Sequence, residues 1–481
     1  MQTGESTPVP SDKLARNSIG IAHIVFFVVA AAAPLTAVVG ATPPAFAFGN
    51  GPGVPGAFVL AGLLYLVFSV GFTTMGRHVR GAGAFYTYIA NGIGKPAGVG
   101  GAFMALLTYS SVQIAVYGMI GVFTQTAFAA LGVDLPWWVW SFSFLLIVHF
   151  SGQRNIAFSG AILGICMLAE MVILLMLDIG IVLHGGGPQG FSVTSFAPET
   201  VFSPGIGVSL VFVVGSFIGF EATAIFGEEA HRPEITIPRA TYVSVLLIAI
   251  FYAFSTWAIV QYYGPDNIRT VASGALNTLF FDAATKVLGP WAAHAMNILL
   301  ITSLFACILS FHNTLNRYFF ALGREGLAFK VLGKVHEIHG SPYVAGMLQS
   351  SIAAIVLAAF ALTGQDPFTV VFSYMSALAV LSILSTQALV SIAILMFFHN
   401  NRRGHGVLRT AVAPAIALLA LAGAIVLVIS NLDLLAGSSN IVVDSFPFIV
   451  VAVGILGVLY ALSIRKTSPA RYAALGEIFE A

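Results

Sequence analysis

The chain has 481 residues, of which 58% are hydrophobic and only 8% are charged, with a formal net charge of +1 at pH 7. Soluble domains contain about 25% charged residues, so a chain this poor in charge cannot cover a folded surface with polar groups and must present much of it to lipid. The small net charge gives no indication of nucleic-acid binding. The two cysteines, Cys166 and Cys307, lie in apolar runs, which indicates neither a disulfide framework nor a metal site.

Residues 1–17 form a polar segment that contains Lys13 and Arg16 and leads directly into an apolar run. A short apolar core followed by a small-residue cleavage site, which would indicate a removable signal peptide, is not found there. We therefore expect residues 1–17 to remain as a cytoplasmic N-terminal tail.

Long apolar runs then follow one another along the chain. A spanning helix requires about 20 mostly apolar residues, because roughly 30 Å of hydrocarbon is crossed at 1.5 Å per residue. Backbone groups in lipid must pair internally, which favours helices over the short alternating strands of a barrel. The sequence therefore predicts an all-α integral membrane protein with twelve transmembrane helices. They lie near residues 21–48, 56–76, 97–130, 136–150, 155–183, 205–229, 239–263, 290–320, 342–363, 367–398, 408–430 and 444–464.

The basic residues predict the orientation of these spans. With a cytoplasmic N-terminus, every Lys and Arg except Arg269 and Lys286 falls on the cytoplasmic side, as the positive-inside rule expects. The opposite side carries the acids Asp134, Glu199, Asp266, Asp282, Asp366, Asp433 and Asp444. We therefore predict a multi-pass protein of the cell membrane with both termini in the cytoplasm, residues 465–481 being the C-terminal tail.

Two of the predicted spans contain helix-breaking sequences. The first has Gly-Ala-Thr-Pro-Pro at 40–44, and adjacent prolines remove two backbone donors. The sixth has two glycines at 215–221, a segment that ends in an acid. Broken helices five spans apart indicate an inverted-repeat transporter with its site at mid-membrane. Either break alone is equally consistent with the general abundance of Gly and Pro in membrane helices.

Unpaired backbone groups at these breaks predict the substrate site. Amides of the first break favour an anionic group, and carbonyls near Val214 and Phe217 favour an ammonium group. Phe217 and Phe220 are candidate walls for an apolar side chain. The predicted substrate-binding residues are Val39, Gly40, Ala41, Thr42, Val214, Gly215, Ser216, Phe217, Ile218 and Phe220.

Three ordered motifs resemble those of the amino acid–polyamine–organocation (APC) superfamily, in its bacterial amino acid permease branch. The first motif is similar to the loop after the second span of that family, the second to its sixth span and the third to the end of its eighth span. The first motif is Arg80–Tyr88. The second consists of Gly219-Phe220-Glu221, Glu228-Glu229, Pro233 and Ile237–Ala240. The third consists of Asn313, Asn316, Arg317, Gly323–Gly326 and Ser341-Pro342.

This resemblance implies the LeuT-like fold, with a ten-helix transport core at 18–398. The core consists of two inverted five-helix repeats, about 18–183 and 205–398, and two peripheral helices follow at 408–464. Amino-acid-carrying members have a Gly-x-Gly step in the broken first helix, where this chain has Val-Gly-Ala-Thr-Pro-Pro at 39–44. Because of that departure, the sequence does not establish whether the first break contacts a substrate carboxylate.

Glu170 and Glu221 are the only acids that the sequence places well inside the spans. Glu170 follows Arg154 by 16 residues, roughly 24 Å along a helix, so it lies near mid-membrane. It is a candidate proton carrier, or alternatively a neutral hydrogen-bonded group. Glu221 is a candidate gating switch, or a cap for the amides of the broken helix. Glu228 and Glu229 are expected to form interfacial salt bridges with nearby arginines.

The function predicted from these features is secondary active transport of an amino acid or related small amine by alternating access, with proton symport. Sodium coupling at Ser303 and Ser310 is an alternative. So are a polyamine or other organocation transporter, an exchanger without net proton coupling, and a membrane sensor that does not transport. The chain has no clustered catalytic groups, so we predict no enzyme activity and no cofactor. The expected partners are the solute, a proton and the lipid bilayer.

Overall fold

The computed structural model describes residues 20–79, 84–154, 160–221, 223, 230–324, 326–437, 439–473 and 475. Every element of regular secondary structure in these ranges is a helix. Nine helical segments of the described chain are long and apolar enough to cross a membrane. The prediction of an all-helical, multi-pass membrane protein is therefore confirmed.

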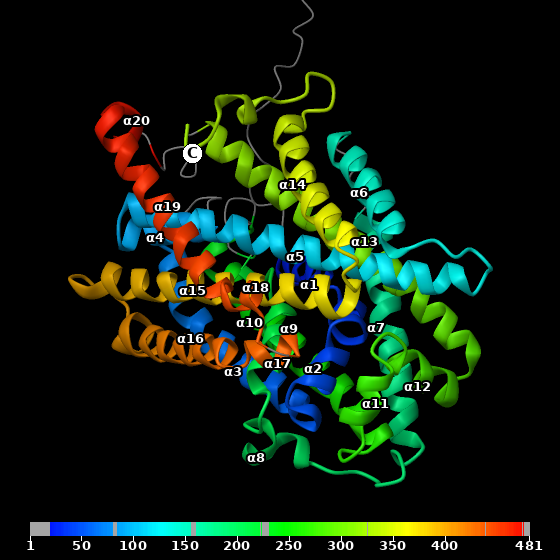
Figure 1. Cartoon of the computed structure of the whole chain (residues 1–481). Coiled ribbons are helices and arrows are strands. Elements are labelled where there is room, and N and C mark those ends of the chain that lie inside the picture. The colour runs from blue at the N-terminus through cyan, green and yellow to red at the C-terminus, as the bar shows by residue number, and fades with distance from the viewer. Residues whose placement is uncertain are drawn as a thin grey trace, which may run out of the picture.

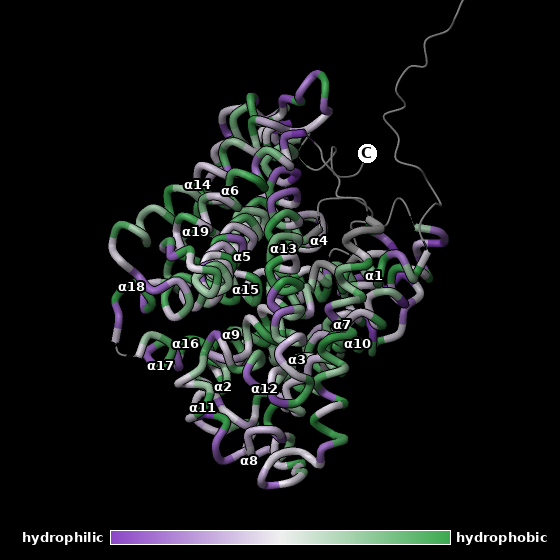
Figure 2. Tube along the Cα trace, turned by 90° about the vertical axis from the view of Figure 1, so that its right-hand side faces the viewer, coloured by the Kyte–Doolittle hydropathy of each residue, from purple (hydrophilic) through white to green (hydrophobic). Residues whose placement is uncertain are grey.

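The long helices follow each other in the order that the apolar runs predict (Figure 1). They are α3 (Val54–Gly76), α5 (Lys95–Ala129), α7 (Gly160–Leu183), α10 (Pro233–Tyr263), α13 (Pro290–Arg324), α14 (Tyr343–Leu362), α15 (Ser373–His399), α16 (Ala413–Ile429) and α19 (Phe446–Thr467). The shorter α6 (Trp137–Gln153) lies between α5 and α7 in the sequence. Hydrophilic residues lie mainly in the connections between helices (Figure 2).

The first apolar run is interrupted between its two helical halves. Helix α1 (Ile21–Ala32) ends before Ala33, which has φ = 47°, and a π-helical turn η1 (Thr36–Gly40) precedes α2 (Thr42–Phe48). Proline disfavours the helical conformation of the residue before it, and Ala33 precedes Pro34. The prolines 43 and 44 instead occupy the first turn of α2, where a missing donor costs no helical hydrogen bond. The interruption therefore lies N-terminal to the predicted position.

The sixth apolar run is interrupted where the glycines predict it. Helix α9 (Ile206–Gly215) ends at Gly215, and residues 216–219 form turns. Gly219 has φ = 112°, a conformation that side-chain-bearing residues rarely adopt. The structure thus provides two interrupted apolar helices, α1–α2 and α9 with its following turn.

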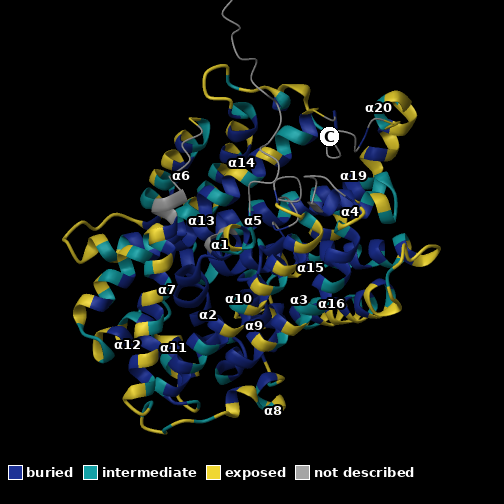
Figure 3. Ribbon diagram, turned by 180° about the vertical axis from the view of Figure 1, so that it is seen from behind, coloured by how far each residue is buried: buried dark blue, intermediate teal, exposed yellow. Residues whose placement is uncertain are grey.

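Burial separates a core from a periphery. The buried share of residues in the most apolar stretch differs among the long segments. It is 72% in α5 and 72% in the segment that ends in α15, but only 22% in the segment that ends in α19. Dark blue in Figure 3 marks the buried residues, which are dense around α2, α3, α9 and α10. α3 packs along α10, and α5 packs against both α13 and α15. Helices α2 and α9 therefore lie in the densely buried region, and the segment that ends in α19 is the least buried of the long ones described.

Short helices occupy the connections. They are α4 (Ala84–Gly92), α8 (Pro198–Val201), α11 (Ile268–Gly274), α12 (Leu279–Val287), α17 (Leu432–Ala436), α18 (Ile441–Asp444) and α20 (Pro469–Ala473). α11 packs against α2, so the connection after α10 covers one end of the first interrupted helix.

A histidine pair joins the end of α3 to the loop before α16. Nε2 of His78 lies 2.9 Å from Nε2 of His405, which requires one ring to donate and the other to accept. Burial, together with the neighbouring His405 and two arginines, lowers the pKa of His78. The neutral pair is therefore favoured, and it ties the loop before α16 to the end of α3.

Candidate substrate and ion-coupling site

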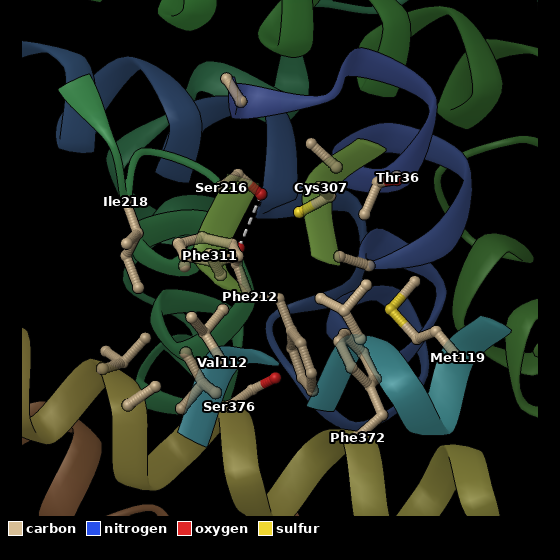
Figure 4. A pocket seen from close by; sticks show the side chains of 18 residues that line it. Thr36, Val112, Met119, Phe212, Ser216, Ile218, Cys307, Phe311, Phe372 and Ser376 are labelled. Carbon is tan, nitrogen blue, oxygen red and sulfur yellow. Dashed lines mark hydrogen bonds between the residues drawn. The ribbon is translucent and has the colours of Figure 1, made fainter. Parts of the chain in front are cut away.

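A cavity lies between the two interrupted helices. Residues of five segments form its wall: α1 with the turn to α2, then α5, α9 with its following turn, α13, and α15 with the residue before it. They are Ala32, Thr36, Ala37, Ala41, Val112, Val116, Met119, Val211, Phe212, Gly215, Ser216, Ile218, Cys307, Phe311, Phe372, Ser376, Ala379 and Val380. In Figure 4, Thr36, Cys307 and Ser216 lie on the upper side of the cavity and Phe372 and Ser376 on the lower side.

The cavity is small and almost entirely apolar. Its volume is about 60 Å³. Its wall offers three hydroxyls, those of Thr36, Ser216 and Ser376, and the thiol of Cys307. The Ser216 hydroxyl donates to the Phe212 carbonyl over 2.8 Å, which ties it to its own helix (Figure 4). Among the described lining residues none carries a charge.

Four of the predicted substrate-binding residues line this cavity. They are Ala41, Gly215, Ser216 and Ile218. Two others, Phe217 and Phe220, pack against Tyr65, with ring centroids 5.0 and 4.8 Å from its ring. The structure therefore brings the ends of both interrupted helices to one cavity and directs these two aromatic rings away from it.

The remaining predicted residues are buried beside the interruptions without lining the cavity: Val39, Gly40, Thr42 and Val214. Gly40 packs against Met119, since an added Cβ would collide with the Met119 methyl carbon. The Thr42 hydroxyl donates to the Val38 carbonyl over 2.6 Å. Thr36 and Ala37 line the cavity instead of the predicted Val39 and Gly40, which lie about one turn later in the chain.

The walls that α5, α13 and α15 contribute have no signal in the sequence. Val112, Val116, Phe311, Phe372 and Val380 are ordinary apolar residues in apolar spans. Only the packing of these helices around the breaks distinguishes them from other core residues. Nothing in the residue types at these positions signals a cavity.

Glu170 is buried at the first interruption and is hydrogen-bonded. Its Oε2 accepts from the Ser303 hydroxyl over 2.7 Å and from the Leu35 amide over 3.4 Å. The Thr36 hydroxyl in turn donates to Ser303 Oγ over 3.1 Å. Because Thr36 lines the cavity, two hydrogen bonds connect Glu170 to the cavity wall.

The two serines of the sodium alternative differ in their surroundings. Ser303 is buried and donates to the Glu170 carboxylate, whereas Ser310 is half-buried. The Ser310 carbonyl accepts from the Thr314 hydroxyl over 3.0 Å, a contact within α13. The structure therefore does not bring the two serines together at Glu170.

Asp178 is a third buried acid, which the sequence does not single out as a candidate. It lies on α7, eight residues after Glu170, and its side chain is 1% exposed. The Ser255 hydroxyl on α10 donates to its carboxylate over 2.6 Å. Asp178 is therefore buried in the protein together with Glu170 and Glu221, and α10, which packs against α7, carries its partner Ser255.

Glu221 is buried directly after the second interruption. Its Oε1 accepts from the Tyr109 hydroxyl over 2.7 Å, and its Oε2 accepts from the Gly219 amide over 3.0 Å. The carboxylate therefore ties the turn after α9 to α5. Glu228 and Glu229 lie outside the described residues.

Comparison with known proteins identifies the family. The amino acid permease family matches residues 23–470. The serine/threonine exchanger SteT of Bacillus subtilis is 22% identical over 308 residues, covering 63% of this chain and 67% of that protein. The aromatic amino acid transport protein AroP of Escherichia coli is 23% identical over 355 residues, covering 72% and 74%. The amino-acid permease RocE of Bacillus subtilis is 23% identical over 286 residues, covering 57% and 59%.

These matches confirm the resemblance to the APC superfamily. They also place the chain among transporters rather than enzymes. Because the family match covers most of its length, the chain belongs to the amino acid permease family.

Proposed function

We propose that this protein is a proton-coupled secondary transporter that carries an amino acid across the cell membrane by alternating access. The observation that carries the proposal is the cavity between two interrupted helices, with a buried carboxylate two hydrogen bonds from its wall. Transporters of this type bind substrate at such interruptions, where half-helix termini offer unpaired backbone groups. The names of the relatives cover hydroxyl-bearing and aromatic amino acids, so the family leaves the side chain of the substrate open.

The proposal includes the twelve-span, LeuT-like arrangement. The interrupted pair α1–α2, the helix α6 and the interrupted α9 supply three further segments beside the nine long ones of the described chain, which makes the proposed twelve. In this arrangement residues 18–183 and 205–398 are the inverted repeats and 408–464 are the peripheral helices. The low burial of the segment that ends in α19 supports its peripheral place.

Glu170 is the proposed proton carrier. An isolated ion is costly in a membrane interior, and an acid there changes its charge by taking up or releasing a proton. The ionised carboxylate accepts from Leu35 and Ser303 and so holds α13 to the first interruption. Protonation weakens these charge-assisted bonds and favours movement of the interrupted helix. Binding of a proton is thereby linked to the change between the two access states.

Uptake into proteoliposomes tests the proposal. An inward proton gradient is expected to drive accumulation of labelled amino acids in sodium-free buffer, and a protonophore is expected to abolish it. Accumulation that requires sodium and ignores the pH gradient would contradict proton coupling. Exchange without any net uptake would show an obligate exchanger, and binding without exchange would show a sensor.

Thiol labelling tests the topology, with both termini proposed in the cytoplasm. Cysteines replacing Thr363 after α14 and Arg402 after α15 occupy exposed positions at opposite ends of α15. In a variant that lacks Cys166 and Cys307, an impermeant maleimide is expected to label position 363 from outside the cell and position 402 only after permeabilisation. Labelling of both positions from one side would contradict the twelve-span arrangement.

A further inference from the structure

We infer that the cavity selects amino acids whose side chains are small and uncharged. The inference rests on the proposed function for the amino acid itself and adds the class of side chain. It depends on three properties of this cavity. The described wall residues carry no charge, the cavity is small, and the Ser376 hydroxyl is available for a hydrogen bond with a substrate.

The wall excludes charged side chains. Its described residues are apolar apart from three hydroxyls and one thiol. A charged group buried without a partner costs several kcal/mol, and it requires an opposite charge together with hydrogen bonds. Hydrogen bonds through Ser303 and Thr36 connect the buried acid Glu170 to the wall, and Glu170 already accepts from Ser303 and Leu35. A lysine, a glutamate or a polyamine therefore finds no matching charge in the wall.

The space excludes large side chains. The cavity is small, with a volume of about 60 Å³. The rings of Phe212 and Phe372, which both line the cavity, pack together with centroids 5.4 Å apart. Small wall residues supply the available space, namely Ala37, Ala41, Gly215 and Ala379. An aromatic substrate would have to separate the two phenylalanine rings.

Ser376 offers a contact to a small polar side chain. Of the three wall hydroxyls, Thr36 donates to Ser303 and Ser216 donates to the Phe212 carbonyl. The Ser376 hydroxyl donates no such hydrogen bond to the described part of the chain. Ser376 lies on α15, and Phe372 directly precedes that helix. A substrate hydroxyl can therefore be accommodated there. The expected class comprises alanine, serine, threonine and similar neutral amino acids.

Cys307 provides a direct measure of binding, because its thiol lines the cavity and Cys166 is the only other cysteine. In a Cys166→Ser variant, we expect alanine, serine or threonine to slow modification of Cys307 by methyl methanethiosulfonate. At ten times the dissociation constant the slowing should be about tenfold. Phenylalanine, tryptophan, lysine, glutamate and putrescine should leave the rate unchanged. Equal protection by any charged or aromatic compound would overturn the inference.

A cavity-enlarging variant gives a second, independent measure. Phe372→Ala removes one of the packed rings, so phenylalanine should compete with labelled alanine for uptake, which it should not do in the wild-type protein. Phe123→Ala is the matched control, because Phe123 is equally buried and packs against Phe281 and Phe368 outside the cavity wall. An unchanged substrate range in Phe372→Ala, or the same gain in the control, would contradict the inference.

The two experiments separate this inference from the proposed function. Protection of Cys307 by small neutral amino acids without any transport would contradict the proposed function and leave the side-chain class intact. Transport of a charged or aromatic amino acid by the wild-type protein, without protection by alanine, would leave the transporter intact and overturn the side-chain class.

Discussion

Replacement of Glu170 by glutamine is expected to abolish proton-driven accumulation and to leave substrate exchange in place. Glutamine keeps the shape of the side chain and accepts from Ser303 and Leu35, but it does not titrate. An inward gradient of two pH units is worth about 2.7 kcal/mol, or about a hundredfold accumulation at one proton per substrate. The variant should therefore equilibrate labelled substrate at a ratio near one. The measurement is the internal to external ratio in proteoliposomes, alongside counterflow exchange.

Asp178→Asn is the matched control for this variant. Asp178 is also a buried acid on α7 with a serine hydroxyl on its carboxylate, but its partner Ser255 lies on α10 and not at the interruption. The control should accumulate substrate to the wild-type ratio. If Glu170→Gln accumulates normally and Asp178→Asn does not, the coupling carboxylate is Asp178. If both accumulate normally, neither acid couples the proton.

The all-helical, multi-pass class could be predicted because lipid leaves the chain few alternatives. A run of apolar residues in a charge-poor chain must pair its backbone groups internally, and the described part of the chain has nine long helices in the predicted order. The position of the first interruption was harder to predict. The adjacent prolines at 43 and 44 predict a break, but they are tolerated in the first turn of a helix. The isolated Pro34, inside an alanine-rich run, determines the end of α1 through the residue that precedes it.

The candidate site could be predicted only in part, for a physical reason. Backbone interruptions leave a trace in the sequence, so Gly215 and Ser216 could be located at the cavity. Side chains that reach the same cavity from intact helices leave none, as Val112 and Phe372 show. Partners of the buried acids were also not predictable, because Ser303 and Tyr109 lie on other helices, 133 and 112 residues from the acids they contact.

Replacement of Glu221 by glutamine is expected to slow exchange as well as net uptake, in contrast to Glu170→Gln. The carboxylate accepts from the Gly219 amide and from Tyr109 at once, and so joins the turn after α9 to α5. Hydrogen bonds to a charged group contribute about 1.5–3 kcal/mol, against about 0.5–1.5 kcal/mol for neutral pairs. Weakening both bonds by about 1 kcal/mol each shifts the balance between access states by roughly thirtyfold. Exchange should therefore slow by about tenfold or more.

Two comparisons distinguish a gating effect from loss of the site or the fold. Tyr109→Phe removes only one of the two hydrogen bonds, so it should slow exchange in the same direction and by less. Because Glu221 does not line the cavity, alanine should still protect Cys307 from modification in both variants. Slow exchange with intact protection identifies Glu221 as a group that controls the movement of the interrupted helix. Exchange at the wild-type rate in Glu221→Gln would instead restrict this carboxylate to capping the turn.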